Sequence, residues 1–205
     1  RKRFGIRGEL GINLSSKDFL MIGTRYRDRE FGGDSKQNYS EWEITDVGSI
    51  DYISNMARSR EGTNYSIYLN YDRKFNSNGH ILKAEIQFEK GNGDELTINE
   101  LLDSNSDVLS GRKSTEAGPD TEIESRIDYT LPLDEKTKFE AGYQNEIETS
   151  NEITGISDFD PILRKYSVLS EYDKDVLYES NEHSLYSIFA SKWKDFGYQF
   201  GMRAE

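Results

Sequence analysis

The chain has 205 residues and a formal net charge of −12 at pH 7, with 34% hydrophobic and 12% aromatic residues. The apolar fraction is low for a globular core, whereas the aromatic content argues against disorder, and the acidic balance excludes nucleic acid as an expected partner. The absence of cysteine excludes disulfides and thiol chemistry, and no apolar run approaches the roughly 20 residues of a membrane-spanning helix.

Alternating apolar and polar residues predict long β-strands on both sides of four short polar turns. Before the first turn, Phe4, Ile6 and Leu10 alternate with Arg7 and Glu9. Alternation over eight or more residues is typical of a strand with one face in apolar surroundings. The four turns are Ser15–Asp18, Asn76–Gly79, Leu133–Lys136 and Lys194–Asp195.

The alternation also predicts which residues share a face of each strand. We expect one face to carry Phe4, Ile6, Leu10, Leu69, Tyr71, Leu82, Ile86, Ile127, Tyr129, Phe200 and Met202. We expect the other face to carry Arg7, Glu9, Asn70, Asp72, Lys83, Glu85, Arg126, Asp128, Gln199 and Arg203. In a membrane barrel the apolar set would lie outside and the charged set inside, which is the reverse of a soluble barrel.

The turns begin at residues 15, 76, 133 and 194, so their spacing is 61, 57 and 61 residues. Polar stretches at about 33–61, 92–121 and 151–180 are expected to be long loops. Short turns alternating with long loops predict an all-β fold: an antiparallel up-and-down transmembrane β-barrel wall of about eight long strands in four hairpins. Residues 1–205 would form a single segment of a larger barrel. The soluble alternative is a β-sandwich or a lipocalin-like binding module.

Two side-chain groups favour the membrane interpretation. Phe19, Phe75, Trp193 and Phe196 lie beside short turns, where an aromatic girdle would meet the membrane interface. Arg25, Arg27 and Arg29 form a basic row on one strand face, which suits a hydrated lumen. We expect acidic residues of neighbouring strands to pair with this row, since unpartnered like charges are destabilising.

The segments "NYSIYLNYDRKFNSNGHILKAEIQFEKG", "RIDYTLPLDEKTKFEAGYQNEIE" and "NEHSLYSIFASKWKDFGYQFGMRAE" carry a resemblance over most of residues 62–205. In composition and order they resemble the barrel region of TonB-dependent outer-membrane receptors of the Bacteroidetes type, an outer membrane β-barrel family. The resemblance implies the bacterial outer membrane, nutrient uptake, a plug domain, and energy supplied by a TonB-type coupling protein. Lipid would cover the outer face of the barrel.

The chain also departs from that pattern. It shows no plug sequence and no TonB box, and its strands are far fewer than the roughly 22 of such transporters. We therefore expect a fragment whose edge strands pair with the remainder of the same barrel. Another outer-membrane barrel, porin-like or an assembly protein, is the alternative. The transported substrate and the ligand-binding residues are not predicted.

Motifs for catalysis, cofactors and metals are nearly absent, so we expect no enzyme, no cofactor and no metal site. His80 and His183 lie in no metal-ligand spacing, and no nucleophile elbow or phosphate-binding loop occurs. Asp103, Asn105 and Asp107 resemble the start of a calcium loop, but the glycine and the final glutamate of that motif are missing. The acidic stretch 94–124 is expected to be a hydrated external loop, and the alternative is a loop that contacts an ion or a ligand.

Overall fold

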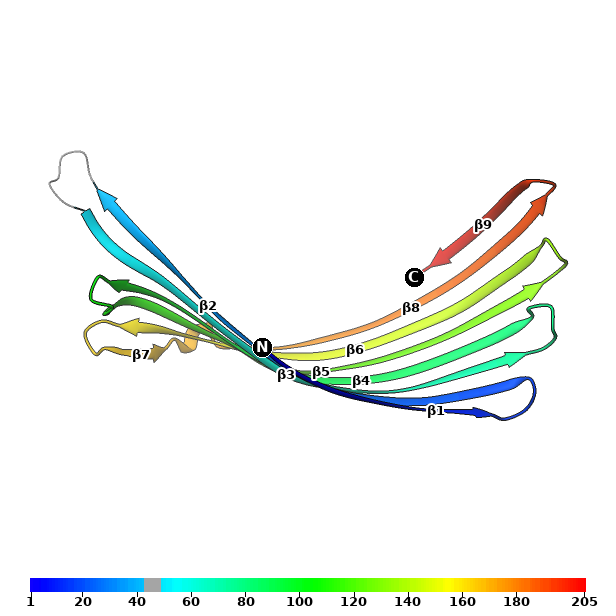
Figure 1. Ribbon diagram of the computed structural model, residues 1–205, viewed down its shortest axis with the longest axis horizontal. Coiled ribbons are helices and arrows are strands. Elements are labelled where there is room, and N and C mark those ends of the chain that lie inside the picture. Colours follow the sequence, from blue (N-terminus) through cyan, green and yellow to red (C-terminus); the bar gives the residue numbers. More distant parts are fainter. Residues whose placement is uncertain (43–48) are drawn as a thin grey trace.

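The computed structural model describes residues 1–42 and 49–205, which form one nine-stranded antiparallel sheet (Figure 1). Its eight long strands are β1 (Lys2–Asn13), β2 (Asp18–Trp42), β3 (Ser49–Lys74), β4 (Ile81–Asp103), β5 (Val108–Pro132), β6 (Lys138–Asp160), β8 (Lys174–Trp193) and β9 (Phe196–Ala204). The short strand β7 (Lys165–Val168) and the 3-10 turn η1 (Ser170–Tyr172) lie between β6 and β8. Within the described ranges, no helix is long and apolar enough to cross a membrane.

Each long strand pairs with the next long strand along the chain, in the order β1-β2-β3-β4-β5-β6-β8-β9. The four predicted short turns join β1 to β2, β3 to β4, β5 to β6 and β8 to β9. All four lie at one end of the sheet, here called the short-turn end, and the other connections lie at the opposite, long-hairpin end (Figure 1). The predicted up-and-down topology is confirmed.

The long loops predicted at about 33–61, 92–121 and 151–180 are wrong, because most of these residues extend the strands. β4 continues to Asp103 and β5 begins at Val108, so residues 104–107 are all that connect them. Residues 43–48, from the first of the three stretches, lie outside the described residues. The cause is physical: where both faces of a strand meet water, hydrophobic alternation disappears although the backbone ladder continues.

The apolar residues predicted to share a face do so. One row of directly paired residues crosses all eight long strands: Ile12, Leu20, Tyr71, Ala84, Ile127, Tyr143, Leu185 and Ala204. This row and its same-face neighbours form the outer band, which occupies residues 4–12, 20–26, 65–71, 82–88, 123–131, 139–147, 185–193 and 196–204. These segments of seven to nine residues are the centres of the membrane-spanning parts of the strands, since a tilted strand needs about 9–11 residues to cross.

Burial on β3 shows which face is crowded. Tyr65, Ile67 and Leu69 of the outer band are 42%, 51% and 36% exposed. The residues between them are buried: Ser66 is 2% exposed and Tyr68 is 6% exposed. A sheet that exposes its apolar face and buries its polar face is inverted relative to a soluble domain, as expected where lipid is the solvent.

The outer band is staggered with respect to the short turns. Along the fully paired row, Leu20 lies two residues into β2, Tyr143 lies five residues into β6, and Leu185 lies eight residues before the end of β8. A steadily growing offset means that the strands are tilted relative to the band. Tilt and stagger of this kind are required when a sheet curls into a barrel.

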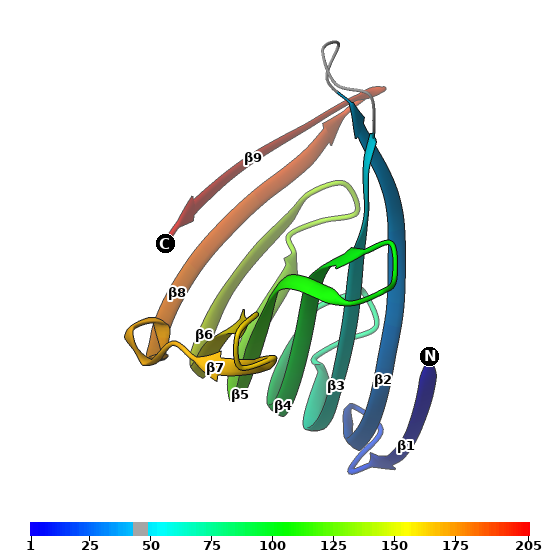
Figure 2. The ribbon, with the colours of Figure 1, turned by 90° about the vertical axis from the view of Figure 1, so that its left-hand side faces the viewer.

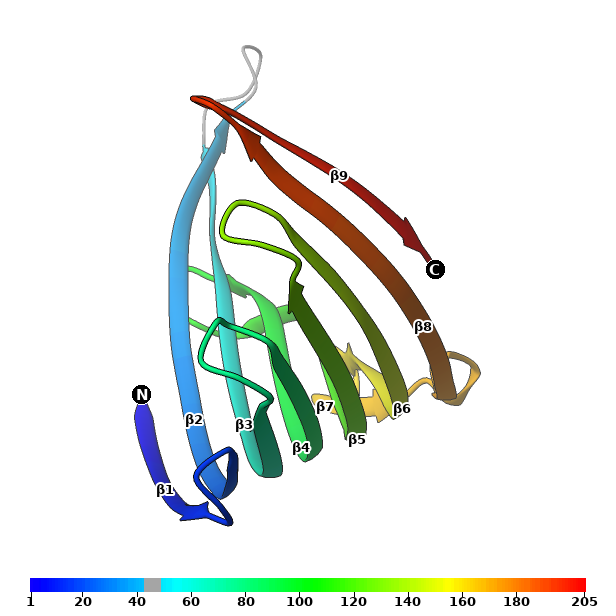
Figure 3. The same cartoon turned by 90° about the vertical axis from the view of Figure 1, so that its right-hand side faces the viewer.

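The sheet is twisted and curved, and its two edges are β1 and β9 (Figures 2 and 3). No pairing joins these two strands among the residues that the structure describes. The backbone groups along their outer sides therefore form open edges, which are ready to pair with further strands.

Candidate functional site: the charged inner face

The polar side chains that alternate with the outer band form the inner face of the sheet. The predicted polar set lies there, and direct strand pairing places Asn70 beside Glu85, Glu85 beside Arg126, and Asp72 beside Lys83. Buried polar residues also gather on this face, including Asn64, Ser66 and Ser184. The inner face is thus a hydrated but closely packed surface, and it holds the charges that could contact a solute.

A tyrosine brace ties β3 to β1 across β2. The side chain of Tyr68 lies over Gly23 of the neighbouring strand and donates its hydroxyl hydrogen bond to Glu9. Arg7 donates to the same hydroxyl at 3.1 Å and to Glu9 at 2.9 Å. A side chain at position 23 would occupy the space of the tyrosine ring, so glycine is needed for this close approach.

A second brace of the same design ties β8 to β5 across β6. Tyr186 lies over Gly142 and donates its hydroxyl hydrogen bond to Asp128, which pairs with Arg126 at 2.8 Å. Both braces consist of an arginine and a carboxylate two residues apart, a glycine on the next strand, and a tyrosine on the strand after that. The same arrangement of four residues thus cross-links three neighbouring strands at two places in the curved wall.

The basic row predicted on β2 is only partly paired. Arg27 donates to Asn64 of β3 at 3.2 Å and lies 3.4 Å from Glu89 of β4, across that strand. Asn64 itself donates to Glu89 at 2.7 Å. Arg25 and Arg29 make no ion pair among the described residues. The expected pairing with acids of neighbouring strands is therefore found for the middle residue of the row.

Farther toward the long-hairpin end, a second ionic contact joins β3 to β4. Arg58 of β3 donates to Glu95 of β4 at 2.7 Å, and Arg60 lies 3.9 Å from the same carboxylate. The hydrogen bond from Arg58 lowers the pKa of Glu95 below its usual range. Together with the Arg27–Glu89 pair, these contacts form a neutralised seam that runs from β2 to β4.

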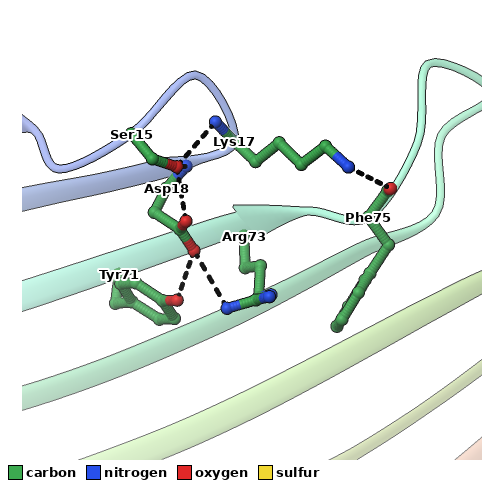
Figure 4. A network of polar contacts seen from close by, with 6 residues as sticks. All are labelled: Ser15, Lys17, Asp18, Tyr71, Arg73 and Phe75. Atoms are coloured by element: carbon green, nitrogen blue, oxygen red, sulfur yellow. Dashed lines mark hydrogen bonds and ion pairs between the residues drawn. The ribbon is translucent and has the colours of Figure 1, made fainter.

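A polar network anchors the first two short turns (Figure 4). Asp18 accepts hydrogen bonds from Ser15 at 2.5 Å and from Tyr71 at 2.6 Å, and it forms an ion pair with Arg73 at 3.3 Å. These bonds, led by that from Ser15, lower the pKa of Asp18. Lys17 donates to the carbonyl of Phe75, which joins the first turn to the second.

The aromatic girdle predicted beside the short turns is correct in part. Trp193 and Phe196 are direct pair partners, lie on the outer face, and are 69% and 67% exposed. Phe19 instead pairs with Asn13 and therefore belongs to the inner face. The prediction failed there because proximity to a turn does not specify the face, whereas strand parity does.

The histidines belong to aromatic contacts. His80 stacks on Phe75 and forms a hydrogen bond with the hydroxyl of Tyr129 at 2.7 Å. His183 forms the same kind of bond with Tyr143, also at 2.7 Å. Both pairs lie on the outer face, and the spacing rules used for metal ligands could not have indicated them. Among the described residues, no cluster of three or more His, Asp or Glu side chains is arranged to hold a metal ion.

The stretch that resembled a calcium loop is a hairpin turn. One carboxylate oxygen of Asp103 accepts hydrogen bonds from the backbone N–H groups of Asn105 and Asp107, at 2.9 and 2.8 Å. Asp107 in turn pairs with Arg164 at 2.5 Å. Two of the three calcium-like side chains thus hold the turn and the neighbouring connection.

Arg112 and Asp158 add a bidentate ion pair between β5 and β6, at 2.7 and 2.8 Å.

An antiparallel wall with an apolar outer band and a charged inner face defines a section of a membrane-spanning β-barrel. Residues 73–205, more than half of the chain, match the outer membrane protein β-barrel family. The chain belongs to this family and is a protein of the bacterial outer membrane. A comparison with curated proteins gave no match.

Proposed function

We propose that the chain forms part of the barrel of a TonB-dependent outer-membrane receptor that takes up a nutrient, and that it is not an enzyme. The observation that supports this proposal best is the open wall. Eight long strands pair in sequence without β9 meeting β1. Because barrel diameter grows with strand number, a wall that is still open after eight strands belongs to a wide barrel.

A wide barrel needs partners that this wall does not supply. Further strands of the same protein would pair with the open edges of β1 and β9, and a plug domain would occupy the part of the lumen near the short-turn end. Lipid would contact the outer band. A TonB-type protein would act through segments outside this sequence.

The short-turn end would face the periplasm and the long-hairpin end the cell exterior, since that is the usual orientation of such barrels.

A porin-like channel is the second candidate, and the charged inner face favours it. Side chains such as Arg25, Arg29 and Glu182 suit a water-filled lumen whether or not transport is energised. The two candidates differ in their energy source: a receptor needs the proton-motive force of the inner membrane, and a porin does not.

The test compares uptake by cells that contain the full-length protein with uptake by a deletion strain. Both strains are grown on single nutrients, namely ferric siderophores, cobalamin, oligosaccharides or peptides, with and without a protonophore. We expect the protein to support uptake of one nutrient class, and the protonophore to abolish that uptake. Uptake that persists with the protonophore would identify a porin-like channel. No uptake of any class, combined with a loss of other outer-membrane proteins, would identify an assembly protein.

A further inference from the structure

The inner face is divided into a positively charged side and a negatively charged side. On β1 and β2, arginines stand directly opposite arginines: Arg3 pairs with Arg29, and Arg7 pairs with Arg25. Like charges opposite one another on paired strands are destabilising. The opposed arginines therefore reduce the stability of the basic side. Of these four arginines, Arg7 has an ion-pair partner, Glu9, among the described residues.

The opposite side of the inner face is acidic. Glu122 of β5 stands between Glu89 of β4 and Glu148 of β6 in the direct pairing of the strands. Glu146 of β6 likewise stands between Glu124 of β5 and Glu182 of β8. Four directly opposed glutamate pairs result. Of these six residues, Glu89 makes an ion pair with a described residue.

The two sides meet at the neutralised seam that runs from β2 to β4. There Arg27 pairs with Glu89, and Arg58 pairs with Glu95. Away from the seam, the uncompensated charge is positive toward β1 and negative toward β8. A solute held against the inner face would therefore meet a potential that changes sign across its width, in a site where walls of low dielectric constant concentrate the field.

From this division we propose that the inner face binds a dipolar solute, such as a zwitterionic peptide, with its anionic end over the arginines of β1–β2 and its cationic end over the glutamates of β5–β8. The proposal rests on the proposed transport function and specifies its substrate class. A purely cationic solute would be attracted by one side and repelled by the other, and a purely anionic solute would meet the same conflict in reverse. A dipolar solute alone complements both sides.

The test uses the full-length protein in lipid nanodiscs and three fluorescent hexapeptides. One peptide carries two glutamates at one end and two lysines at the other, the second carries lysines only, and the third carries glutamates only. We expect the dipolar peptide to bind at least about tenfold more tightly than either of the others, in line with two complementary charged contacts instead of one. Equal affinities, or tightest binding of a singly charged peptide, would overturn the proposal.

Paired substitutions locate the two ends of the peptide. Glu124→Gln with Glu146→Gln should weaken binding of the dipolar and cationic peptides by about tenfold, and should not weaken the anionic one. Arg25→Gln with Arg29→Gln should do the converse. Lys2→Gln and Glu30→Gln are matched controls, because this ion pair lies on the outer side of the same wall. Control variants that weaken binding as much as the inner-face variants would show that the inner face is not the site.

A second measurement uses the unmodified protein, so its result does not depend on whether the substituted variants fold. Binding of the dipolar peptide to the unmodified protein should weaken as salt is raised from about 0.05 to 0.5 M, because exposed charges are screened over that range. Affinity that does not change with salt would also reject the proposal. Binding is measured in nanodiscs without an energy source, so it can be detected even if energised uptake fails. Conversely, uptake of a nutrient can be detected even if the dipolar peptide does not bind.

Discussion

The ring of Tyr68 lies over Gly23 on the neighbouring strand, in the space that any larger residue at position 23 would need. The same relationship joins Tyr186 to Gly142. Each tyrosine also makes a hydrogen bond with a carboxylate one strand farther on. The two braces therefore couple three strands each, and they set how closely the curved wall can pack.

Replacing Gly23 with alanine should destabilise the barrel by about 1–3 kcal/mol, because the added methyl group displaces the tyrosine ring. Unfolding of the full-length protein by urea in vesicles measures the effect. Gly197→Ala is the matched control, since a methyl group there meets no atom within 4 Å. Equal stabilities for the two variants would show that the Tyr68 ring moves without penalty.

The two faces of β3 should respond oppositely to charge. Leu69→Arg, on the outer band, should cost about 2–4 kcal/mol, because it places a guanidinium in the membrane. Asn70→Arg should cost much less, since the inner face is polar. Cysteines at the two positions provide a direct check: a label at 69 should be quenched from lipid, and a label at 70 from water. The reverse quenching pattern would contradict the assignment of the faces.

Acid should weaken the short-turn network. Because Ser15 and Tyr71 lower the pKa of Asp18 in the folded state, the carboxylate contributes stability above its usual value of 3.8, and that contribution is lost as the pH falls through the lowered pKa. Ser15→Ala keeps the charge but removes the main hydrogen bond, so the acid transition should move to higher pH. Asp18→Asn should remove this part of the pH dependence. Stability profiles that are identical for all three proteins would exclude the network as the cause.

The seam should depend on Arg27 more than on its neighbours in the row. Arg27→Gln removes the ion pair with Glu89 and a hydrogen bond to Asn64, so we expect a loss of about 1 kcal/mol. Arg29→Gln removes no ion pair with a residue that the structure describes, and it reduces repulsion from Arg3, so it should be neutral or slightly stabilising. Urea unfolding of both variants measures the difference. A larger loss for Arg29→Gln would mean that its charge has an essential partner.

The membrane-spanning half of each strand could be predicted from sequence because lipid and water impose opposite demands on its two faces. The alternation at Leu69 and Asn70, or at Ile127 and Asp128, follows directly from the difference between the two environments. The strands beyond the membrane could not be predicted in this way. Residues around Asn99 and Ser114 meet water on both sides, so no alternation marks the pairing that the structure shows.

The contacts of the inner face could not be predicted from the sequence for another reason. Tyr68 contacts Gly23 and Glu9 because of the register of three strands, and the register between distant segments cannot be inferred from either segment alone. Arg27 likewise reaches Glu89 across an intervening strand. A glycine in the middle of a strand was the available signal, since it often marks a close approach.

Pairing between successive strands has a consequence for how the wall is made. Every long strand finds its partner in the next one along the chain, so loop closure never spans more than a hairpin and the contact order stays low for a β protein. The wall can therefore grow by stepwise addition, with each finished edge acting as the template for the following hairpin. Lengthening such a wall requires duplication of a hairpin and no rearrangement of earlier strands, which is a direct route by which barrels of different circumference can evolve.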